Sequence, residues 1–490
     1  MFRFKPSSRP ILIAIVALLA CGGCAREGWA TERSPSQHYA EELVNDASSQ
    51  PASKPRIIVL TDMTSITPGV REPDDSQSMI RLMLYANEFD IEGLIASSGL
   101  QHGHVVRPEI IRKIVNAYGE VQPNLLLHDE DYPSADSLRN VIKSGQPNAG
   151  EDVPVYESIG ERKDTEGSDW IIQMVDKPDD RPVWIVIWGG PADLAQALWK
   201  VRKLRSQQDF RTFVNKIRVI AGGDQDSTAA WIKSRFPELF YVTRSEGGRG
   251  MYRGGDTSLV SSQWIQDNIR GHGALGDIYP DYRGGDTYSH KIGKVRGIKG
   301  GDSCTYMGLI SNGLNIPAHL TWTNWGGRLI PEPKNATRYS DAVDHVGTYT
   351  SDMSPHWATV YRWRPHFQAD YAARFDWAVN SYDKANHAPT KESGTQRIVR
   401  RVSAGEKINL RSGTWRDPDG NNLSYHWQVL REETATPTDR AVENSHSDMA
   451  QLTLPEVRGS ESIHVLLTVT DDGRPALNSY QRFNLIVLPQ

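Results

Sequence analysis

The chain of 490 residues is longer than one ordinary core requires, so two or more domains are expected. Its hydrophobic content of 38% and charged content of 23% are typical of a globular protein, and its net charge of −5 excludes a general nucleic-acid binder, which needs a basic surface. It has only three cysteines, which excludes a disulfide framework.

Residues 1–24 are typical of a signal peptide, because basic residues precede Ile11–Ala20, an apolar run too short to span a membrane. The sequence Leu18-Leu19-Ala20-Cys21 resembles a bacterial lipobox, in which the cysteine is acylated, and ordinary cleavage nearby is the alternative. Residues 25–54 are polar, which predicts a flexible tether. We therefore expect an exported protein, periplasmic or at the cell surface, that meets the membrane only through a lipid anchor.

Strands and helices alternate through residues 55–385. Short apolar runs predict buried strands, and helical spacing between them predicts amphipathic helices. The predicted strands are Ile57–Leu60, Ile91–Ser97, Val183–Ile187 and Ile217–Ala221, and the predicted helices are Ser76–Asn87 and Asp193–Lys200. This alternation predicts an α/β domain with a mostly parallel sheet and helices on both faces. Active sites of such folds lie at the carboxyl ends of the strands, where acids and glycines occur in this sequence.

A six-residue repeat, Tyr-Arg-Gly-Gly-Asp-Thr, occurs at Tyr252–Thr257 and again at Tyr282–Thr287. Glycine and aspartate favour tight turns, so the favoured interpretation is turn chemistry used twice. A binding role for the two loops is the alternative interpretation.

The character of the sequence changes at residues 386–490, where alternating runs separated by acidic turns predict an immunoglobulin-like β-sandwich. Trp427 is its predicted core aromatic residue. In the turn that begins Asp-Pro-Asp-Gly, Asp417, Asp419 and Asn421 offer oxygen ligands for a second calcium ion. A plain turn explains the same residues and is the favoured interpretation.

Three acids flank the first predicted strand and helix: Asp62 ends the strand, and Asp74 and Asp75 precede the helix. Carboxylates gathered at one strand-to-helix junction repel one another unless a cation lies among them, and calcium prefers such oxygen ligands. Helix capping is the alternative, and it explains Asp74 or Asp75 but not Asp62.

Several stretches resemble a known family. Leu60-Thr61-Asp62 followed by Pro73-Asp74-Asp75 resembles the calcium-binding motif Asp-x-Asp-Pro-Gly-x-Asp-Asp of nucleoside hydrolases. Glu72–Ser78, Asn87–Ile95 and Trp325–Arg328 resemble a bacterial and fungal branch that carries a C-terminal sandwich and has been linked to cellulose binding.

The resemblance implies a role for each acid. It implies Asp62 as both calcium ligand and general base, Asp75 as a calcium ligand, and Asp74 as the contact to sugar hydroxyls. The backbone carbonyl of Trp188 and the side chain of Asp302 are implied as the remaining calcium ligands.

The sequence also departs from the family pattern. Leu60 replaces the first Asp of the motif, Met63–Arg71 lengthens the following loop, and Gly301 replaces a His before the late Asp. The ribose-gripping Glu-Phe-Asn segment is not evident; in its place Asp226 and Trp231 are the predicted substrate contacts. Calcium is therefore better supported than ribose.

The predicted activity is calcium-dependent hydrolysis of a glycosidic bond, N-glycosidic by resemblance, in a sugar-containing substrate. Asp62 takes a proton from a water that calcium polarises, and the carboxylates stabilise a transition state of oxocarbenium character. His272 is a candidate acid for the leaving group because its pKa range suits that task. A loop histidine without a role is the favoured alternative.

Two non-catalytic functions are alternatives. A protein that binds cellulose or a cell-wall polysaccharide could retain the metal site for structure, in keeping with its 14 tryptophans. A surface adhesin is the weaker alternative, since only the lipobox and the sandwich favour it. The expected partner is a sugar-containing small molecule or a polysaccharide, and the related enzymes suggest a homodimer.

Overall fold

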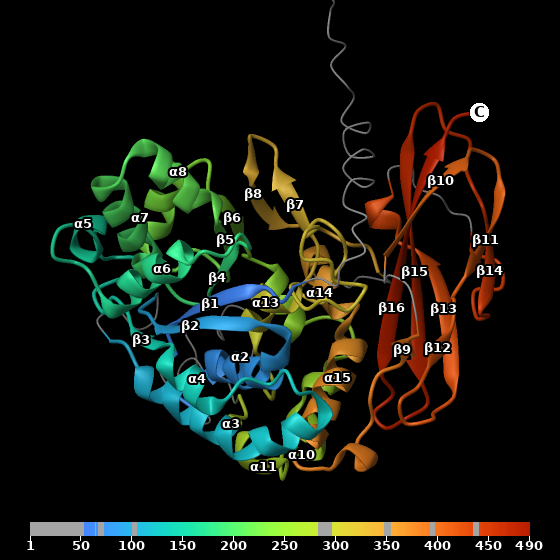
Figure 1. Cartoon of the computed structure of the whole chain (residues 1–490), viewed down its shortest axis with the longest axis horizontal. Coiled ribbons are helices and arrows are strands. Elements are labelled where there is room, and N and C mark those ends of the chain that lie inside the picture. Colours follow the sequence, from blue (N-terminus) through green and yellow to red (C-terminus); the bar gives the residue numbers. More distant parts are fainter. Residues whose placement is uncertain are drawn as a thin grey trace, which may run out of the picture.

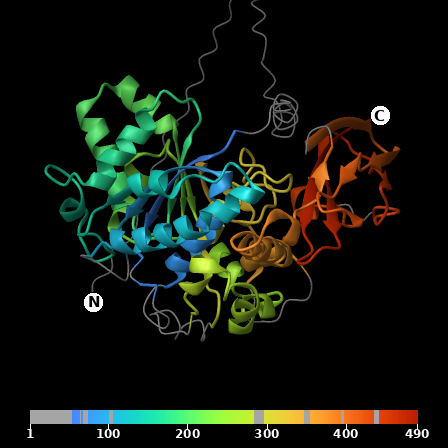
Figure 2. The same ribbon diagram turned by 60° about the horizontal axis from the view of Figure 1, so that its bottom comes forward.

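The computed structural model describes residues 53–63, 65–66, 73–99, 105–282, 296–346, 354–392, 397–434 and 441–490. The predicted signal peptide, most of the predicted tether and most of the second Tyr-Arg-Gly-Gly-Asp-Thr repeat lie outside these residues. Figures 1 and 2 show an α/β domain with a smaller all-β domain beside it. Within the described part of the chain, no helix is long and apolar enough to cross a membrane.

The α/β domain is built on an eight-stranded sheet of order β3-β2-β1-β4-β5-β6-β8-β7. Its strands are β1 (Arg56–Thr61), β2 (Asp90–Ala96), β3 (Ile142–Ser144), β4 (Val183–Ile187), β5 (Ile217–Ala221), β6 (Phe240–Thr243), β7 (Leu329–Glu332) and β8 (Asn335–Asp341). Neighbouring strands are parallel, apart from β7, which is antiparallel to β8. The predicted mostly parallel sheet is confirmed.

Helices cover both faces of this sheet (Figure 1). Successive side chains of a strand point to opposite faces, so Ile57 and Val59 of β1 pack in one core, and Ile58 and Leu60 in the other. The first core includes residues of α2 (Pro73–Leu84), α3 (Pro108–His128), α4 (Ala135–Asn140), α10 (Ser262–Asn268), α11 (Gly273–Asp277), α13 (Cys304–Met307), α14 (Pro355–Tyr361) and α15 (Arg364–Trp377). Against the second core pack α5 (Val155–Ser158), α6 (Glu166–Asp176), α7 (Ala192–Leu204), α8 (Gln207–Asn215) and α9 (Ser227–Arg235).

Short 3₁₀ helices lie between these elements: η1 (Ala86–Glu88), η2 (Gly247–Met251), η3 (Thr257–Val260), η4 (Gly301–Ser303), η5 (Tyr382–Lys384) and η6 (Arg431–Glu433). One predicted boundary was wrong in a way that matters for the site. Helix α2 begins at Pro73 instead of Ser76, so Asp74 and Asp75 lie within its first turn. Proline fits a first helical position, and acids there meet the positive end of the helix dipole.

The C-terminal domain is all-β, as predicted. Its strands are β9 (Thr390–Lys391), β10 (Arg397–Ser403), β11 (Lys407–Arg411), β12 (Trp415–Arg416), β13 (Leu423–Val429), β14 (Met449–Thr453), β15 (Glu461–Asp471) and β16 (Asn478–Leu488). A four-stranded sheet of order β10-β16-β15-β13 faces the two-stranded pair β11-β14. Trp427 is 1% exposed in the core of this domain, which confirms its predicted place.

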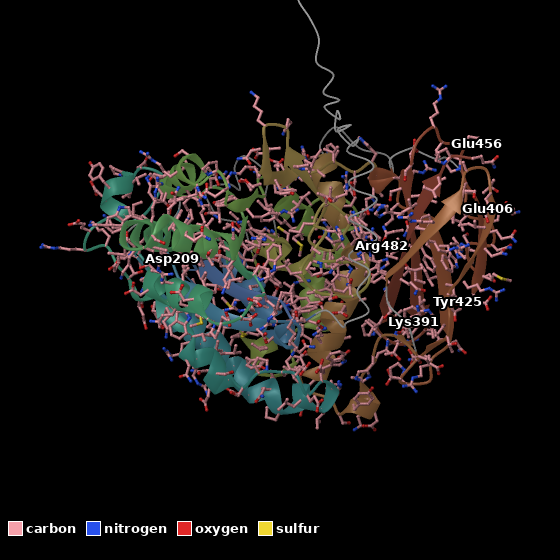
Figure 3. The ribbon with its side chains drawn as sticks, turned by 45° about the horizontal axis from the view of Figure 1, so that its top comes forward. Asp209, Lys391, Glu406, Tyr425, Glu456 and Arg482 are labelled. Carbon is pink, nitrogen blue, oxygen red and sulfur yellow. The ribbon has the colours of Figure 1, made fainter. Side chains whose placement is uncertain are left out.

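A buried ion pair within the C-terminal domain forms hydrogen bonds with the α/β domain. The carboxylate of Glu433 lies 2.5 Å from the Arg482 guanidinium and 3.2 Å from His464 Nδ1, and it accepts a hydrogen bond of 2.5 Å from the backbone N–H of Thr323. Arg482 also donates to the carbonyl oxygens of Leu314 and Thr323, at 3.0 and 3.1 Å. Figure 3 labels Arg482 on the side of the sandwich nearest the α/β domain. We refer to Glu433, Arg482 and His464 as the interdomain ion pair.

Candidate functional site

Four acids meet at the carboxyl end of β1. Asp62 directly follows β1, Asp74 and Asp75 lie in the first turn of α2, and Asp302 lies in η4. All four side chains are buried, with exposed fractions between 2% and 9%. The sequence placed these residues at the same edge of the sheet, and the structure brings them together. We refer to the four residues as the carboxylate cluster.

Two contacts position the cluster. The hydroxyl of Thr61, the last residue of β1, donates a hydrogen bond of 2.5 Å to Asp75 Oδ1. The ammonium of Lys299 lies 3.0 Å from Asp74 Oδ2, and both side chains are more than nine-tenths buried. The first contact ties α2 to the end of β1, and the second ties α2 to the segment that leads into η4.

The carboxylates of the cluster act on one another's ionisation, and the ammonium of Lys299 opposes that effect. Burial, reinforced by the charge of Asp74, raises the pKa of Asp62 to about 7. Burial and the charge of Asp74 likewise hold the pKa of Asp302 well above its ordinary value, and Lys299 opposes both shifts. Asp62 Oδ2 and Asp74 Oδ1 are buried and have no hydrogen-bond partner within the described residues. Such oxygens are costly to bury unless a proton or a ligand meets them.

The side chain of Gln77 holds the Lys299 segment against α2. Its amide donates to the carbonyl oxygens of Pro280 and Gly297, at 2.7 and 2.9 Å. Its Oε1 accepts from the backbone N–H groups of Lys299 and Gly300, at 2.8 and 3.0 Å. All four hydrogen bonds of one buried amide therefore fix the approach to η4, and with it the positions of Lys299 and Asp302.

Glycines after β4 let the backbone approach the carboxylates closely. A Cβ at Gly189 would lie 2.7 Å from the Asp62 side chain. A Cβ at Gly190 would overlap Asp226 Oδ2 and would lie 2.7 Å from the carbonyl oxygen of Ser98. Any larger residue at either position would push against a buried carboxylate, so both positions require glycine.

Asp226 and Trp188 border the cluster on its β4–β5 side. Asp226 caps α9 by accepting from the backbone N–H of Thr228 at 2.7 Å, while its Oδ2 is buried without a hydrogen-bond partner in the described chain. Burial raises the pKa of Asp226 to about 6. The carbonyl oxygen of Trp188, predicted as a calcium ligand, accepts a hydrogen bond from the side-chain amide of Gln225.

The tyrosines of the repeated sequence both lie beside Lys299. The Lys299 ammonium is 5.3 Å from the centroid of the Tyr282 ring, a cation–π contact. Burial raises the pKa of the Tyr252 hydroxyl, and the charges of Lys299 and Asp74 also act on it. Asp256 of the first repeat caps η3, as turn chemistry predicts, so this repeat serves both a turn and the surroundings of the cluster.

The structure does not bring His272 or Trp231 to the cluster. His272 Nε2 bonds Asp376 Oδ1 of α15 at 3.0 Å, and the next residue packs against Val121, in the second half of α3. Because α3 runs back from the carboxyl end of β2, this position lies toward the opposite edge of the sheet. Trp231, in α9, packs edge-to-face against Phe236 of the second core, with 5.3 Å between the ring centroids.

The residues of the cluster fit calcium by their donor chemistry, because they offer carboxylate oxygens and two of these are buried and unpaired. Among the described residues, however, no three Asp, Glu, His or Cys side chains already lie close enough together to hold a metal ion. Calcium binding would therefore require some of these side chains to move.

A cavity of about 650 Å³ lies away from the cluster, by the ends of α7 and α8. It is lined by Arg202, Arg205, Gln207, Phe210, Arg211, Asn215, Arg235 and Glu238. None of these residues belongs to the carboxylate cluster or contacts it through a described hydrogen bond or ion pair. The cavity and the buried acids are therefore separate features.

Sequence reasoning missed Lys299 and Gln77. Lys299 directly precedes Gly300-Gly301-Asp302, and Gln77 lies inside the stretch that carried the family resemblance, so both were in view. Their roles depend on contacts between α2 and a segment more than 200 residues away, which no local pattern contains.

The comparisons with known proteins agree with this architecture. Residues 56–329 match the family described as cellulose-binding Sde182, nucleoside hydrolase-like domain. Residues 407–487 match the C-terminal domain of cellulose-binding protein Sde0182. No curated protein matches the chain.

Among solved structures, a nucleoside hydrolase-related hypothetical protein from Saccharophagus degradans, described as associated with carbohydrate metabolism, is 31% identical with a TM-score of 0.72. The match covers 89% of this chain and all of that one. The PKD domain from the KIAA 1837 protein is 24% identical over 21% of this chain and 92% of its own, with a TM-score of 0.15. Protocadherin gamma C5 is 19% identical over 21% of this chain and 33% of its own, also with a TM-score of 0.15.

Proposed function

Because the chain belongs to the family of cellulose-binding proteins with a nucleoside hydrolase-like domain, we propose that it is a calcium-dependent hydrolase of a glycosidic bond in a carbohydrate substrate. The observation that carries the proposal is the carboxylate cluster at the carboxyl end of the sheet, where ligands of such folds bind. Unpaired buried carboxylate oxygens cost stability, so a role in binding explains them better than a role in folding.

In this mechanism Asp62 is the general base. Its Oδ2, which has no partner in the described residues, accepts a proton from the attacking water as that water bonds to the anomeric carbon. The glycosidic bond breaks through a transition state of oxocarbenium character, whose positive charge the neighbouring carboxylates stabilise. The leaving group keeps the electron pair of the broken bond and takes a proton from solvent water. Asp74, through Oδ1, and Asp226, through Oδ2, would accept hydrogen bonds from sugar hydroxyls, since neither oxygen has a partner within the described residues. His272 takes no part, because its ring bonds Asp376 of α15.

Asp62, Asp75 and Asp302 would hold the calcium ion, with the Trp188 carbonyl available once the Gln225 amide moves away. When bound, calcium would supply Lewis acidity toward water and sugar hydroxyls. The residues of this chain would still carry the proton transfer and the orientation of the sugar.

We propose an exported protein whose partner is cellulose or a related polysaccharide, because the family is described as cellulose-binding. Export, a lipid anchor at Cys21 and a homodimer follow from the sequence and the resemblance alone. Membrane fractionation of cells that express wild-type protein or a Cys21→Ser variant tests the anchor: wild type should sediment with membranes and the variant should not.

A second candidate function is polysaccharide binding without catalysis. Lys299 favours it, because a buried ammonium 3.0 Å from Asp74 already supplies one positive charge where related hydrolases use a metal. In such a binder Lys299 and protonated carboxylates would balance the cluster, and no turnover would occur.

The test is a hydrolysis screen of the full chain against nucleosides, aryl glycosides and cello-oligosaccharides, with calcium or with a chelator. A hydrolase should cleave one class only with calcium, and Asp62→Ala should lose at least about a hundredfold in turnover with unchanged circular dichroism. Retention on cellulose, with no turnover by either form under any condition, would instead support the binder.

Asp256→Ala is the matched control for Asp62→Ala. Asp256 is an acid in a similar glycine loop, but it is exposed and caps η3. Its substitution should leave turnover and cellulose retention at the wild-type level. An equal loss in both variants would mean that the effect on turnover is not specific to the cluster.

A further inference from the structure

A second acidic cluster lies at the junction between the two domains, and the proposed function does not use it. Asp471 ends β15 and is 4% exposed, and Asp417 begins the turn between β12 and β13. In each residue the Oδ2 atom is buried and has no hydrogen-bond partner within the described residues. Two unpaired buried carboxylate oxygens in one junction need a positive partner or a shared proton.

Hydrogen bonds fix the other oxygen of Asp471. Its Oδ1 accepts from the backbone N–H groups of Gly473 and Leu477, at 2.9 and 3.0 Å. The side-chain amide of Asn386 donates to the same atom at 3.1 Å. With Oδ1 held from three sides, the carboxylate cannot turn to give Oδ2 a partner from its own loop.

Asp417 is held in the same way. Its Oδ1 accepts from the backbone N–H groups of Asp419 and Asn421, at 2.9 and 3.0 Å. Burial raises the pKa of Asp471, and the charge of Asp417 adds to that effect, so the two carboxylates lie within electrostatic reach. No described ion pair joins either residue to a lysine or an arginine.

The linker between the domains is bound to the same turn. Asn386 Oδ1 accepts from the side chain of Asn421 at 2.9 Å. The backbone N–H of His387 donates to Asp419 Oδ2 at 2.7 Å, and its ring lies 2.9 Å from His128 Nδ1 at the end of α3. Figure 1 shows the chain leaving α15 for β9 at the lower ends of β13, β15 and β16. The acidic turn therefore connects the sandwich with the linker and the α/β domain.

We propose that a calcium ion binds between Asp417 and Asp471 and fastens the sandwich to the α/β domain. The ligands are the two unpaired Oδ2 atoms, and amide, carbonyl or water oxygens complete the shell. Calcium suits this junction because it takes six to eight oxygen ligands in irregular geometry and tolerates water among them. The junction offers calcium two carboxylates, whereas the carboxylate cluster offers three, so we expect a modest affinity for calcium.

The test is calcium titration of the metal-free full chain by calorimetry, together with thermal unfolding. The Asp417→Asn/Asp471→Asn variant should bind one calcium ion fewer than wild type, whatever the carboxylate cluster binds, and should gain less in Tm from calcium. Calcium should also slow proteolysis of the linker in wild type but not in this variant. Asp472→Asn, in the same turn as Asp471 but exposed, should behave as wild type.

Equal calcium stoichiometry and equal Tm gain in wild type and the double variant would overturn the proposal. A second result would also overturn it: calcium leaves the Tm of wild type unchanged, and the Asp417→Asn variant has a higher Tm than wild type. That result would show that the two carboxylates share a proton. If the double variant does not fold, the single Asp417→Asn change decides. It should weaken calcium binding at one site at least about tenfold, and unchanged affinity would refute the site.

Discussion

The carboxylate cluster and the interdomain ion pair are both buried and charged, yet they differ in their partners. In the ion pair, Glu433 meets Arg482 at 2.5 Å and His464 at 3.2 Å, and both of its carboxylate oxygens accept hydrogen bonds. In the cluster, Asp62 and Asp74 each keep a buried oxygen without a partner in the described chain.

The pKa values express the same difference. Burial opposes the ionisation of Glu433, but Arg482 and His464 outweigh it and lower the pKa of Glu433 to about 2. Burial dominates at Asp62 and raises its pKa to about 7. The charge of Glu433 therefore meets its partners within the fold, whereas Asp62 and Asp74 keep buried oxygens that no described group meets. Four substitutions and a pH series test whether this difference holds.

The largest effect is expected from Arg482→Met, which leaves Glu433 buried beside a neutral side chain. Breaking a buried pair in this way costs about 3–5 kcal/mol. Urea unfolding followed by tryptophan fluorescence should show that loss in the free energy of unfolding. Arg458→Met, at an exposed position of the same domain, should change it by less than about 0.5 kcal/mol. A similar small change for Arg482→Met would mean that the ion pair does not stabilise the docked domains.

The next effect is a loss of stability in acid. The folded pKa of Glu433, about 2, lies below its ordinary value of 4.5, so between these values the unfolded chain binds the proton more readily. The contribution is therefore complete above about pH 5 and disappears as the pH falls to about 2. It amounts to about 3 kcal/mol, because each pKa unit corresponds to about 1.4 kcal/mol.

Glu433→Gln isolates this contribution from those of other acids. The difference in unfolding free energy between wild type and Glu433→Gln should be largest at pH 7 and should shrink steadily between pH 5 and pH 2. A difference that stays constant over this range would show that the carboxylate does not titrate in the way its partners require.

These two regions also show what the sequence could predict. The predicted limits of Val183–Ile187 and Ile217–Ala221 coincide with β4 and β5, because a central parallel strand is buried on both faces and is therefore apolar along its length, apart from Arg218 in β5. The four acids of the cluster were found because each follows a strand or starts a helix. The start of α2 was missed by three residues, since proline and two acids resemble a loop when no packing is known.

Partners distant in sequence could not be predicted. Lys299 reaches Asp74 only because α2 packs on the segment that leads into η4, and Glu433 reaches Arg482, 49 residues away, only because the sandwich brings η6 beside β16. His272 and Trp231 failed to join the cluster for the same reason. His272 follows Gly271 and directly precedes α11, and Trp231 lies in α9. These helices place the two side chains in other parts of the domain.

Gly190→Ala tests the close packing around the cluster. The new Cβ would overlap Asp226 Oδ2 and lie 2.7 Å from the backbone oxygen of Ser98, which cannot move aside easily. Overpacking of this kind costs about 1–3 kcal/mol, measurable by thermal unfolding. Gly459→Ala is the control, because no atom lies within 4 Å of the position where its Cβ would be. A neutral Gly190→Ala would indicate that Asp226 has space to retreat and is not held against the loop after β4.

The smallest effect is expected from Lys299→Met, and it tests the function of the cluster most directly. Removing the ammonium leaves Asp74 unpaired and increases the excess of negative charge, so calcium should bind more tightly, by about tenfold or 1.4 kcal/mol. Calorimetric titration of the full chain measures this, with the exposed Lys334→Met as the control. A hydrolase that needs both charges should lose turnover although its calcium affinity rises. If Lys299→Met binds no calcium and still holds cellulose as wild type does, the ammonium is not competing with a metal, and the polysaccharide-binding function is favoured.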